Sequence, residues 1–300
     1  MMELLPVERE FEGRNRCPLD ASVMRRIDTH MHFWTLAMER SYSLWMTPEL
    51  KVLYGDYGPR DARPLMEANG VEGCVLVAAA STIEEMGYLL GLADGHEFIR
   101  GVVGWVDMLA PDAVRDLEQW ARSPVLKGIR PYLQDLPEDD WILRPELDAV
   151  VRRLAGLGLR FDALIKPRHI INTVRFVERY PDLPVIIDHM AKPMINQGEL
   201  SSWARDMEQF RQLDHVHCKL SGILTEDGPE WTPERVQPYL ETVIDIFGPN
   251  RLVFGSDWPV VNLVADYSRW VDVLDGALKH MTRADQQKVW ASNAERFYGL

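Results

Sequence analysis

Cysteine is scarce in this chain of 300 residues, which has only Cys17, Cys74 and Cys218, an odd number set far apart. This spacing excludes the disulfide framework of a small secreted protein. Cys74 and Cys218 lie inside apolar runs, so we expect them to be buried free thiols. A chain without a disulfide framework is typical of a reducing compartment, and we predict a cytoplasmic location.

Basic residues are also fewer than acidic ones. The chain has 33 lysines and arginines and 46 aspartates and glutamates, which gives a net charge of −13. This excess of negative charge argues against nucleic acid or an anionic membrane as a partner. The longest apolar run, near residues 74–80, is far shorter than the roughly 20 residues that span a bilayer. We therefore expect a small molecule as the partner and leave self-association in a homo-oligomer open.

The first 26 residues carry charges of both signs and lack the apolar segment of a signal peptide. No low-complexity linker or change of composition divides the remainder of the chain. We therefore predict an N-terminal arm over residues 1–25 and one domain over residues 26–300.

Short apolar runs alternate with amphipathic stretches almost to the C-terminus. Several of these runs are apolar on both faces, as at residues 74–77 and 185–187, which is typical of a parallel sheet buried on both sides. The stretches between them have helical periodicity. We predict strands near residues 26–31, 72–78, 100–106, 126–131, 160–165, 184–188, 216–220 and 251–256.

Eight strands that are each followed by a helix predict an α/β fold of the (β/α)8 barrel type. A doubly wound open sheet is the alternative, but no glycine-rich phosphate turn follows the first predicted strand. The longest irregular segments, residues 33–64 and 131–143, follow strands one and four. In a barrel, such segments lie at the C-terminal rim and commonly form a substrate cleft.

Polar side chains with metal-binding chemistry occur where three of these strands end. His30 and His32 are two residues apart at the end of strand one, so they point to the same face. His189 follows strand six and Asp257 follows strand eight. Because barrel active sites form at the C-terminal ends of strands, we expect all four to meet there. Three imidazoles and a carboxylate suit Zn²⁺ or a similar ion, although ordinary hydrogen-bonded polar residues remain the alternative.

Eight short motifs are spread in order over nearly the whole of residues 26–300. The motifs are IDTHMHFW at 27–34, KGIR at 127–130, LQD at 133–135, DDW at 139–141, IDHMAKP at 187–193, CKLSG at 218–222, FGSDWP at 254–259 and NAERFYGL at 293–300. With these motifs the chain resembles the amidohydrolase superfamily, and within it the sugar-acid lactonases related to L-fuconolactone hydrolase.

The resemblance implies a hydrolase that opens a sugar-acid lactone, such as that of a deoxy sugar, with Asp257 activating the water. His30, His32 and His189 match the histidines of the family and would bind one divalent metal with Asp257. Zinc is the first candidate, although some lactonases of this group are thought to need no metal. Arg130 stands where binuclear members have a carboxylated lysine, so we expect a mononuclear site or none that is obligatory.

Four further residues are candidates for binding the substrate. Arg130 and Lys166 end strands four and five, and the guanidinium of Arg130 suits a carboxylate or hydroxyl groups. Lys166 could instead pair with a nearby aspartate. Trp34 and Trp258 follow the first and last strands and could stack on a sugar ring, although packing is the commoner role of such residues.

Two other activities share this set of residues. A metal-dependent decarboxylase of the same superfamily would use the same histidines and late aspartate, and a lactonase acting on a dicarboxylate or muconolactone would differ only in its loops. A barrel that binds a ligand without turnover is the third alternative.

Overall fold

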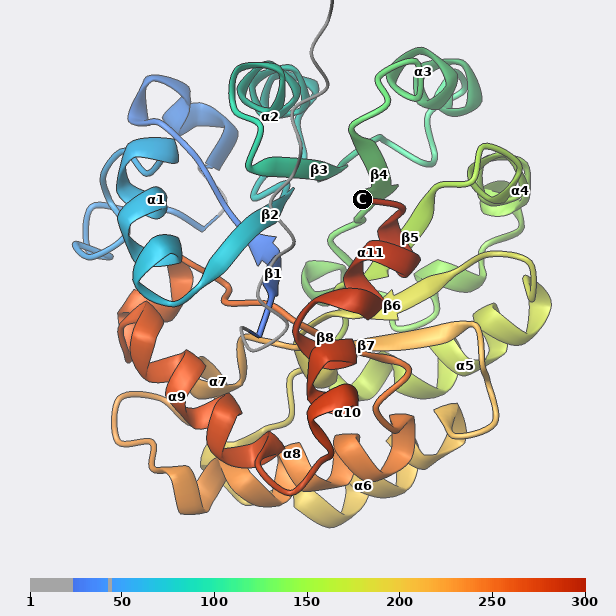
Figure 1. Cartoon of the computed structure of the whole chain (residues 1–300). Helices are drawn as coiled ribbons and strands as arrows, with labels where there is room; N and C mark the ends of the chain where they lie inside the picture. The colour runs from blue at the N-terminus through green and yellow to red at the C-terminus, as the bar shows by residue number, and fades with distance from the viewer. Residues whose placement is uncertain (1–23, 43–44) are drawn as a thin grey trace, which may run out of the picture.

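The computed structural model describes residues 24–42 and 45–300, whose strands form a ring surrounded by helices (Figure 1). The strands pair in parallel, each with the next along the chain. A bridge between Met31 and Trp258 joins the last strand to the first and closes the ring. The strands are β1 Arg26–Met31, β2 Val71–Val77, β3 Ile99–Gly104, β4 Leu126–Ile129, β5 Arg160–Ala163, β6 Val185–Ile187, β7 Val216–Leu220 and β8 Leu252–Phe254.

The helices outside the ring cover the outward-facing side chains of the strands. This packing forms the main core, in which residues such as Leu76, Val102 and Ile129 are buried. The helices are α1 Pro59–Ala68, α2 Ile83–Gly95, α3 Ala113–Trp120, α4 Asp148–Gly156, α5 Ile170–Arg179, α6 Leu200–Met207, α7 Ile223–Asp227, α8 Pro233–Phe247, α9 Tyr267–Leu278, α10 Arg283–Gln287 and α11 Asn293–Tyr298.

The chain ends in helix α11, which lies across the middle of the ring (Figure 1). Phe297 and Tyr298 of this helix pack with inward-facing residues such as Val75 and Val253 in a second apolar cluster. The side chain of Lys127, near the start of β4, donates a hydrogen bond to the Gly299 carbonyl. Helix α11 therefore closes the N-terminal end of the barrel and leaves the opposite end for a site.

The predicted (β/α)8 fold is confirmed, with every strand within two residues of its expected bounds. Cys74 and Cys218 are buried free thiols, as expected. Most of the predicted arm, and Cys17 within it, lie outside the described residues, and the division into arm and domain stays a prediction.

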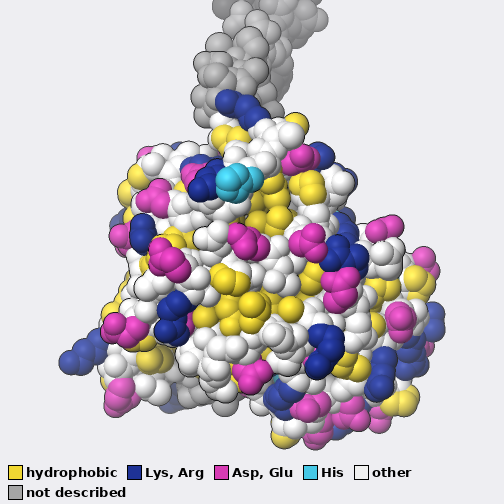
Figure 2. Space-filling view, turned by 90° about the horizontal axis from the view of Figure 1, so that it is seen from below, with side chains coloured by type: hydrophobic (Ala, Val, Ile, Leu, Met, Phe, Trp, Pro, Cys, Tyr) yellow, Lys and Arg dark blue, Asp and Glu magenta, His cyan; other side chains and the backbone are white. Residues whose placement is uncertain are grey.

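One face of the molecule shows how its charges are distributed. On the face seen in Figure 2, acidic and basic side chains are interspersed, and no large basic patch is visible there. None of the helices in the described ranges is both long and apolar enough to cross a membrane.

Candidate active site

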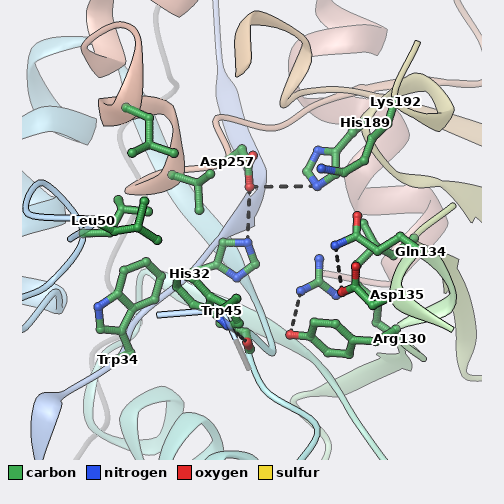
Figure 3. Close-up of a pocket in the computed structure, with 16 residues that line it drawn as sticks. His32, Trp34, Trp45, Leu50, Arg130, Gln134, Asp135, His189, Lys192 and Asp257 are labelled. Carbon is green, nitrogen blue, oxygen red and sulfur yellow. Dashed lines mark hydrogen bonds and ion pairs between the residues drawn. The ribbon is translucent and has the colours of Figure 1, made fainter. Parts of the chain in front are cut away.

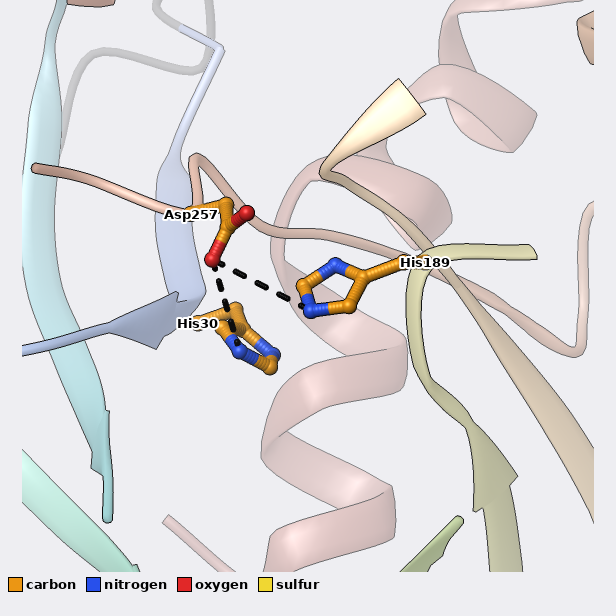
Figure 4. Close-up of side chains that lie close together, drawn as sticks. All are labelled: His30, His189 and Asp257. Atoms are coloured by element: carbon orange, nitrogen blue, oxygen red, sulfur yellow. Dashed lines mark ion pairs between the residues drawn. The ribbon is translucent and has the colours of Figure 1, made fainter. Parts of the chain in front are cut away.

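Closure of the barrel brings Asp257 beside the histidines of β1. The backbone N–H of Asp257 donates to the His30 carbonyl at 2.8 Å, next to the bridge that joins the two strand ends. Its Oδ1 then lies 3.7 Å from Nε2 of His30 and 3.2 Å from Nε2 of His32. His189 approaches from the end of β6, with its Nε2 at 3.9 Å from the same oxygen (Figure 4). All four residues predicted to meet at the C-terminal rim do so.

The backbone is strained where two of these residues are held. Asp257 has a φ of 59°, and His189 begins a run of four left-handed residues that ends at Lys192. A left-handed conformation costs about 1–2 kcal/mol for each non-glycine residue and persists where surrounding structure enforces it. Gly222 packs against the His189 ring so closely that a Cβ there would lie 2.4 Å from Nδ1. The fold thus places both side chains at a cost in backbone energy.

Hydrogen bonds at the remote ring nitrogens orient two of the imidazoles. Nδ1 of His32 lies 2.7 Å from the Val77 carbonyl, which can only accept, so this nitrogen carries the proton. In a neutral His32, Nε2 and the Asp257 carboxylate would then both be acceptors at 3.2 Å. This contact requires a proton on one partner or a cation nearby. Nδ1 of His189 lies 2.9 Å from the Ser221 hydroxyl, which can accept its proton and leave Nε2 free.

Burial sets the charge of these groups. It lowers the pKa of His30 well below the usual range, helped by the Lys219 ammonium, and it does the same to the pKa of His189. Both imidazoles are therefore neutral near pH 7 and retain a lone pair. Burial opposes ionisation of Asp257, but favourable electrostatic interactions, including the hydrogen bond with His32, outweigh it, so the pKa of this carboxyl lies below its ordinary value. Asp257 is consequently a carboxylate.

The donor set fits one divalent cation. His30, His189 and Asp257 each offer an atom, and these atoms lie within 4.8 Å of one another. Neutral imidazole nitrogens and a carboxylate oxygen are the ligands that Zn²⁺ takes in catalytic sites, where a fourth position stays open. His32 lies outside this group of three, although its Nε2 lies 3.2 Å from Oδ1 of Asp257.

Arg130 supplies a fixed positive charge from the end of β4. The residue is 3% exposed, and its Nη1 lies 3.2 Å from Nε2 of His30 and 3.7 Å from Oδ2 of Asp188. Its Nη2 donates to the Ala78 carbonyl and to the Tyr132 hydroxyl. A guanidinium has no lone pair to offer a metal. Arg130 therefore cannot serve as a metal ligand at this corner of the site.

A column of buried charge continues beneath His30 inside the barrel. Lys219 Nζ lies 2.6 Å from Oδ2 of Asp162, 3.0 Å from Oδ1 of Asp188 and 3.2 Å from Nδ1 of His30. None of these four side chains is exposed. The Tyr298 hydroxyl donates to Asp162 at 2.7 Å and links the column to α11. The sequence did not predict this column, although charged residues inside apolar strands could have indicated it.

A pocket of about 250 Å³, partly open to solvent, lies over Asp257 and His32 (Figure 3). The segments 33–64 and 131–143 both line it, as expected from their place after β1 and β4. The lining residues are His32, Trp34, Trp45, Leu50, Leu53, Ala79, Arg130, Tyr132, Gln134, Asp135, Leu164, His189, Lys192, Asp257, Val260 and Leu263.

The structure separates the four predicted substrate-binding residues. Arg130 and Trp34 line the pocket, but Trp34 has no exposed surface and donates from Nε1 to the Gly55 carbonyl. Trp258 lies outside the lining, where its buried ring packs edge-on against Phe33. Lys166 also lies outside it, with 45% of its side chain exposed and its Nζ 3.8 Å from Asp135. Position therefore favours packing for Trp258 and a surface ion pair for Lys166.

Lys192 is a pocket residue that the sequence did not single out. It ends the left-handed run that starts at His189, and its Nζ donates to Glu226 at 3.0 Å. In the sequence, only its place in the motif that follows β6 could have indicated a role for Lys192.

The C-terminal rim of this barrel thus carries His30 and His32 at the end of β1, one histidine after β6 and an aspartate after β8. The amidohydrolase family model matches residues 27–300, and the chain belongs to this family, as its motifs indicated. The chain is 42% identical over 279 residues to the L-fucono-1,5-lactonase of Burkholderia ambifaria, covering 92% of this chain and 96% of the relative.

Two further comparisons agree with this assignment. The L-rhamnono-gamma-lactonase of Scheffersomyces stipitis is 26% identical over 201 residues, which cover 59% of this chain and 60% of that one. A crystal structure of an amidohydrolase from Burkholderia multivorans with bound zinc superposes with a TM-score of 0.86. It is 31% identical and covers 92% of this chain and 99% of its own.

Proposed function

We propose that this protein hydrolyses the ring ester of a sugar-acid lactone, with Asp257 as the base that activates water. The observation that carries the proposal is the position of Asp257, an ionised carboxylate at the pocket floor that three imidazoles approach within 3.9 Å. The lactonases among the relatives support the reaction class. Among lactones, they favour a sugar-acid ring over a dicarboxylate or muconolactone.

The reaction needs one proton to move twice. Asp257 takes a proton from water as the oxygen attacks the carbonyl carbon, and the tetrahedral intermediate expels the ring oxygen. Asp257 then returns the proton to that oxygen, so the products are a carboxylic acid and an alcohol in one open chain. His32, 3.2 Å from Oδ1 of Asp257, lies where it can share this proton.

The negative charge that develops on the carbonyl oxygen needs donors fixed in advance. Arg130 is such a donor, because its guanidinium is buried and tied to the Ala78 carbonyl and the Tyr132 hydroxyl. We assign it to this charge or to a polar group of the substrate. Lys192, held by Glu226, is a second cation in the same pocket.

His30, His189 and Asp257 are the residues that would hold one divalent ion, with zinc favoured by the bound zinc of the Burkholderia multivorans amidohydrolase. When bound, such an ion lowers the pKa of a coordinated water and polarises a carbonyl. This would help Asp257, whose low pKa makes it a weak base toward free water. A cytoplasmic location and self-association stay predictions.

A screen of lactones in weakly buffered solution with a pH indicator tests the proposal, because ring opening releases an acid. We expect turnover of deoxy-sugar lactones by the purified protein. Release of CO₂ from aromatic or unsaturated acids, with no lactone opened, would instead favour the decarboxylase alternative. Tight binding of these compounds without turnover would favour a binding protein.

A further inference from the structure

Three consecutive alanines, Ala78, Ala79 and Ala80, follow β2 at the C-terminal rim, and we call them the alanine segment. The segment belongs to no helix or strand, yet each of its residues is at most 5% exposed. Buried backbone N–H and C=O groups need hydrogen-bond partners, and here no regular ladder supplies them all. The Ala78 N–H donates to the Val103 carbonyl of β3 at 2.8 Å, but the other partners are side chains.

The carbonyl groups of the alanine segment hold three side chains of the pocket. The Ala78 carbonyl accepts from Nη2 of Arg130 and, at 2.8 Å, from the Tyr132 hydroxyl. The Ala79 carbonyl accepts from Nε1 of Trp45 at 2.8 Å. All three side chains line the pocket, where Figure 3 labels Arg130 and Trp45. A shift of this short segment would therefore move the donors of the pocket with it.

One side chain, that of Glu85, holds the amide groups of the same segment. Its Oε1 accepts from the Ala79 N–H at 2.8 Å, and its Oε2 accepts from the Ala80 N–H at 2.7 Å. Glu85 has no exposed surface. A carboxylate suits this position because both of its oxygens accept hydrogen bonds and neither donates. Glu85 thus fixes, by its amides, the segment whose carbonyls hold Arg130.

The place of Glu85 in its helix sets this arrangement apart from ordinary capping. Glu85 is the third residue of α2, which follows the N-cap residue Thr82. A glutamate at this position commonly accepts the backbone N–H of the N-cap residue and stabilises the helix start. Glu85 accepts two amides farther upstream instead, while the Thr82 hydroxyl caps the helix by accepting from the Glu85 N–H. The side chain of Glu85 therefore serves the alanine segment.

Charge links Glu85 to Arg130 as well. Burial raises the pKa of Glu85 to about 7, although the Ala79 and Ala80 amides and the positive charge of Arg130 act in the opposite direction. The guanidinium thus favours the charged form of the carboxylate that helps to place it.

We infer that Glu85 is a positioning residue for the reaction, which acts through the alanine segment to hold the guanidinium of Arg130 in the pocket. The inference rests on the proposed function and adds to it a residue that does not line the pocket. It follows that the loss of Glu85 should slow the reaction only to the extent that a correctly placed Arg130 assists it.

A double-mutant cycle of Glu85→Gln and Arg130→Lys tests this, with kcat/KM measured for the deoxy-sugar lactone that the wild type opens fastest. Glutamine replaces one carboxylate oxygen by an NH2 group, so one backbone N–H of the alanine segment then faces another donor. We expect Glu85→Gln alone to lower kcat/KM about tenfold, because misplacing a binding group is costly. Lysine keeps a positive charge at position 130 but lacks the fork of donors. In that background Glu85→Gln should cost less than about threefold.

Two further variants complete the cycle. Glu84→Gln makes the same change at the preceding, exposed residue of α2 and should match the parent protein in both backgrounds. Glu85→Asp keeps the carboxylate on a chain one methylene shorter, and it replaces Glu85→Gln in the cycle if that variant does not fold. Thermal unfolding of every variant ensures that folded proteins are compared.

Equal losses in the two backgrounds would show that Glu85 serves the fold without acting through Arg130. Wild-type kcat/KM in the folded Glu85 variants would show that the reaction does not need this carboxylate. Either result overturns the inference and leaves the lactonase proposal standing. If the wild type opens no lactone in the screen, the proposed function fails, and the inference fails with it.

Discussion

The environment of each side chain decides its protonation, and this was only partly readable from the sequence. The residue types at strand ends predicted that His30, His32, His189 and Asp257 would meet. They could not predict that the Val77 carbonyl holds His32 by Nδ1, since this contact needs the register between β1 and β2. The sequence also treated the four residues alike, whereas in the structure one atom each of His30, His189 and Asp257 lie within 4.8 Å of one another, and the role of His32 as a ligand stays a prediction.

His217, outside the site, makes the protein sensitive to acid. Burial lowers its pKa to about 3, and its ring packs on Phe297. Below about pH 6.5 this histidine binds a proton in the unfolded chain but not in the folded chain, so a falling pH favours unfolding. We expect His217→Phe to reduce the loss of unfolding free energy between pH 7 and pH 5 by about 2 kcal/mol.

Urea unfolding of both proteins at the two pH values measures this difference. A comparison with His96→Phe, at the residue that caps the C-terminal end of α2, tests whether the effect is specific to His217. An identical loss in His217→Phe and wild type would show that this histidine does not carry the effect.

The strands, which are short and in several cases apolar on both faces, were predictable as elements, but the connections that shape the site were not. Residues 189–192 form a left-handed turn without a glycine, against the local preference of every residue in it. Tertiary contacts with Gly222 and Ser221 hold this turn, and such contacts leave no periodic pattern in a sequence. The segment 33–64 is likewise too irregular to reveal in advance which of its side chains line the pocket.

Gly222 is the element-scale test of this turn. Gly222→Ala would strain a residue whose φ is 62° and would place a Cβ 2.4 Å from Nδ1 of His189. We expect it to lower the free energy of unfolding by about 1–2 kcal/mol and to reduce kcat/KM at least tenfold, because the imidazole must move.

Gly198→Ala is the matched control, since its φ is 72° in the same left-handed region and nothing lies within 4 Å of the added Cβ. It should cost similar stability and keep the activity. Equal activity in the two variants would contradict the claim that Gly222 positions His189.

At the scale of the whole molecule, a chain of buried polar and charged side chains connects the two ends of the barrel. Tyr298 of the C-terminal helix, Asp162, Lys219 and His30 form a continuous path of contacts to the site. Charged residues inside strands β5 and β7 were visible in the sequence. Their pairing was not, because it joins positions 57 residues apart across the barrel.

Replacing Lys219 should lower the free energy of unfolding more than replacing a surface lysine. Lys219→Met leaves Asp162 and Asp188 without their shared cation at positions with no exposure, and breaking a buried ion pair costs about 3–5 kcal/mol. Lys288→Met removes a surface pair with Asp285 and should cost less than about 1 kcal/mol. Thermal and urea unfolding compare the two, and similar losses would contradict a role for the buried column in stability.

The most direct test of the whole account is the rate of lactone ring opening by Asp257→Asn. The amide keeps the shape of the side chain but is not basic, so we expect kcat/KM to fall about a thousandfold with an unchanged thermal transition. Asp245→Asn, at a side chain that is 75% exposed, should match the wild type. A folded Asp257→Asn protein that retains activity within tenfold of the wild type would contradict the assignment of Asp257 as the base.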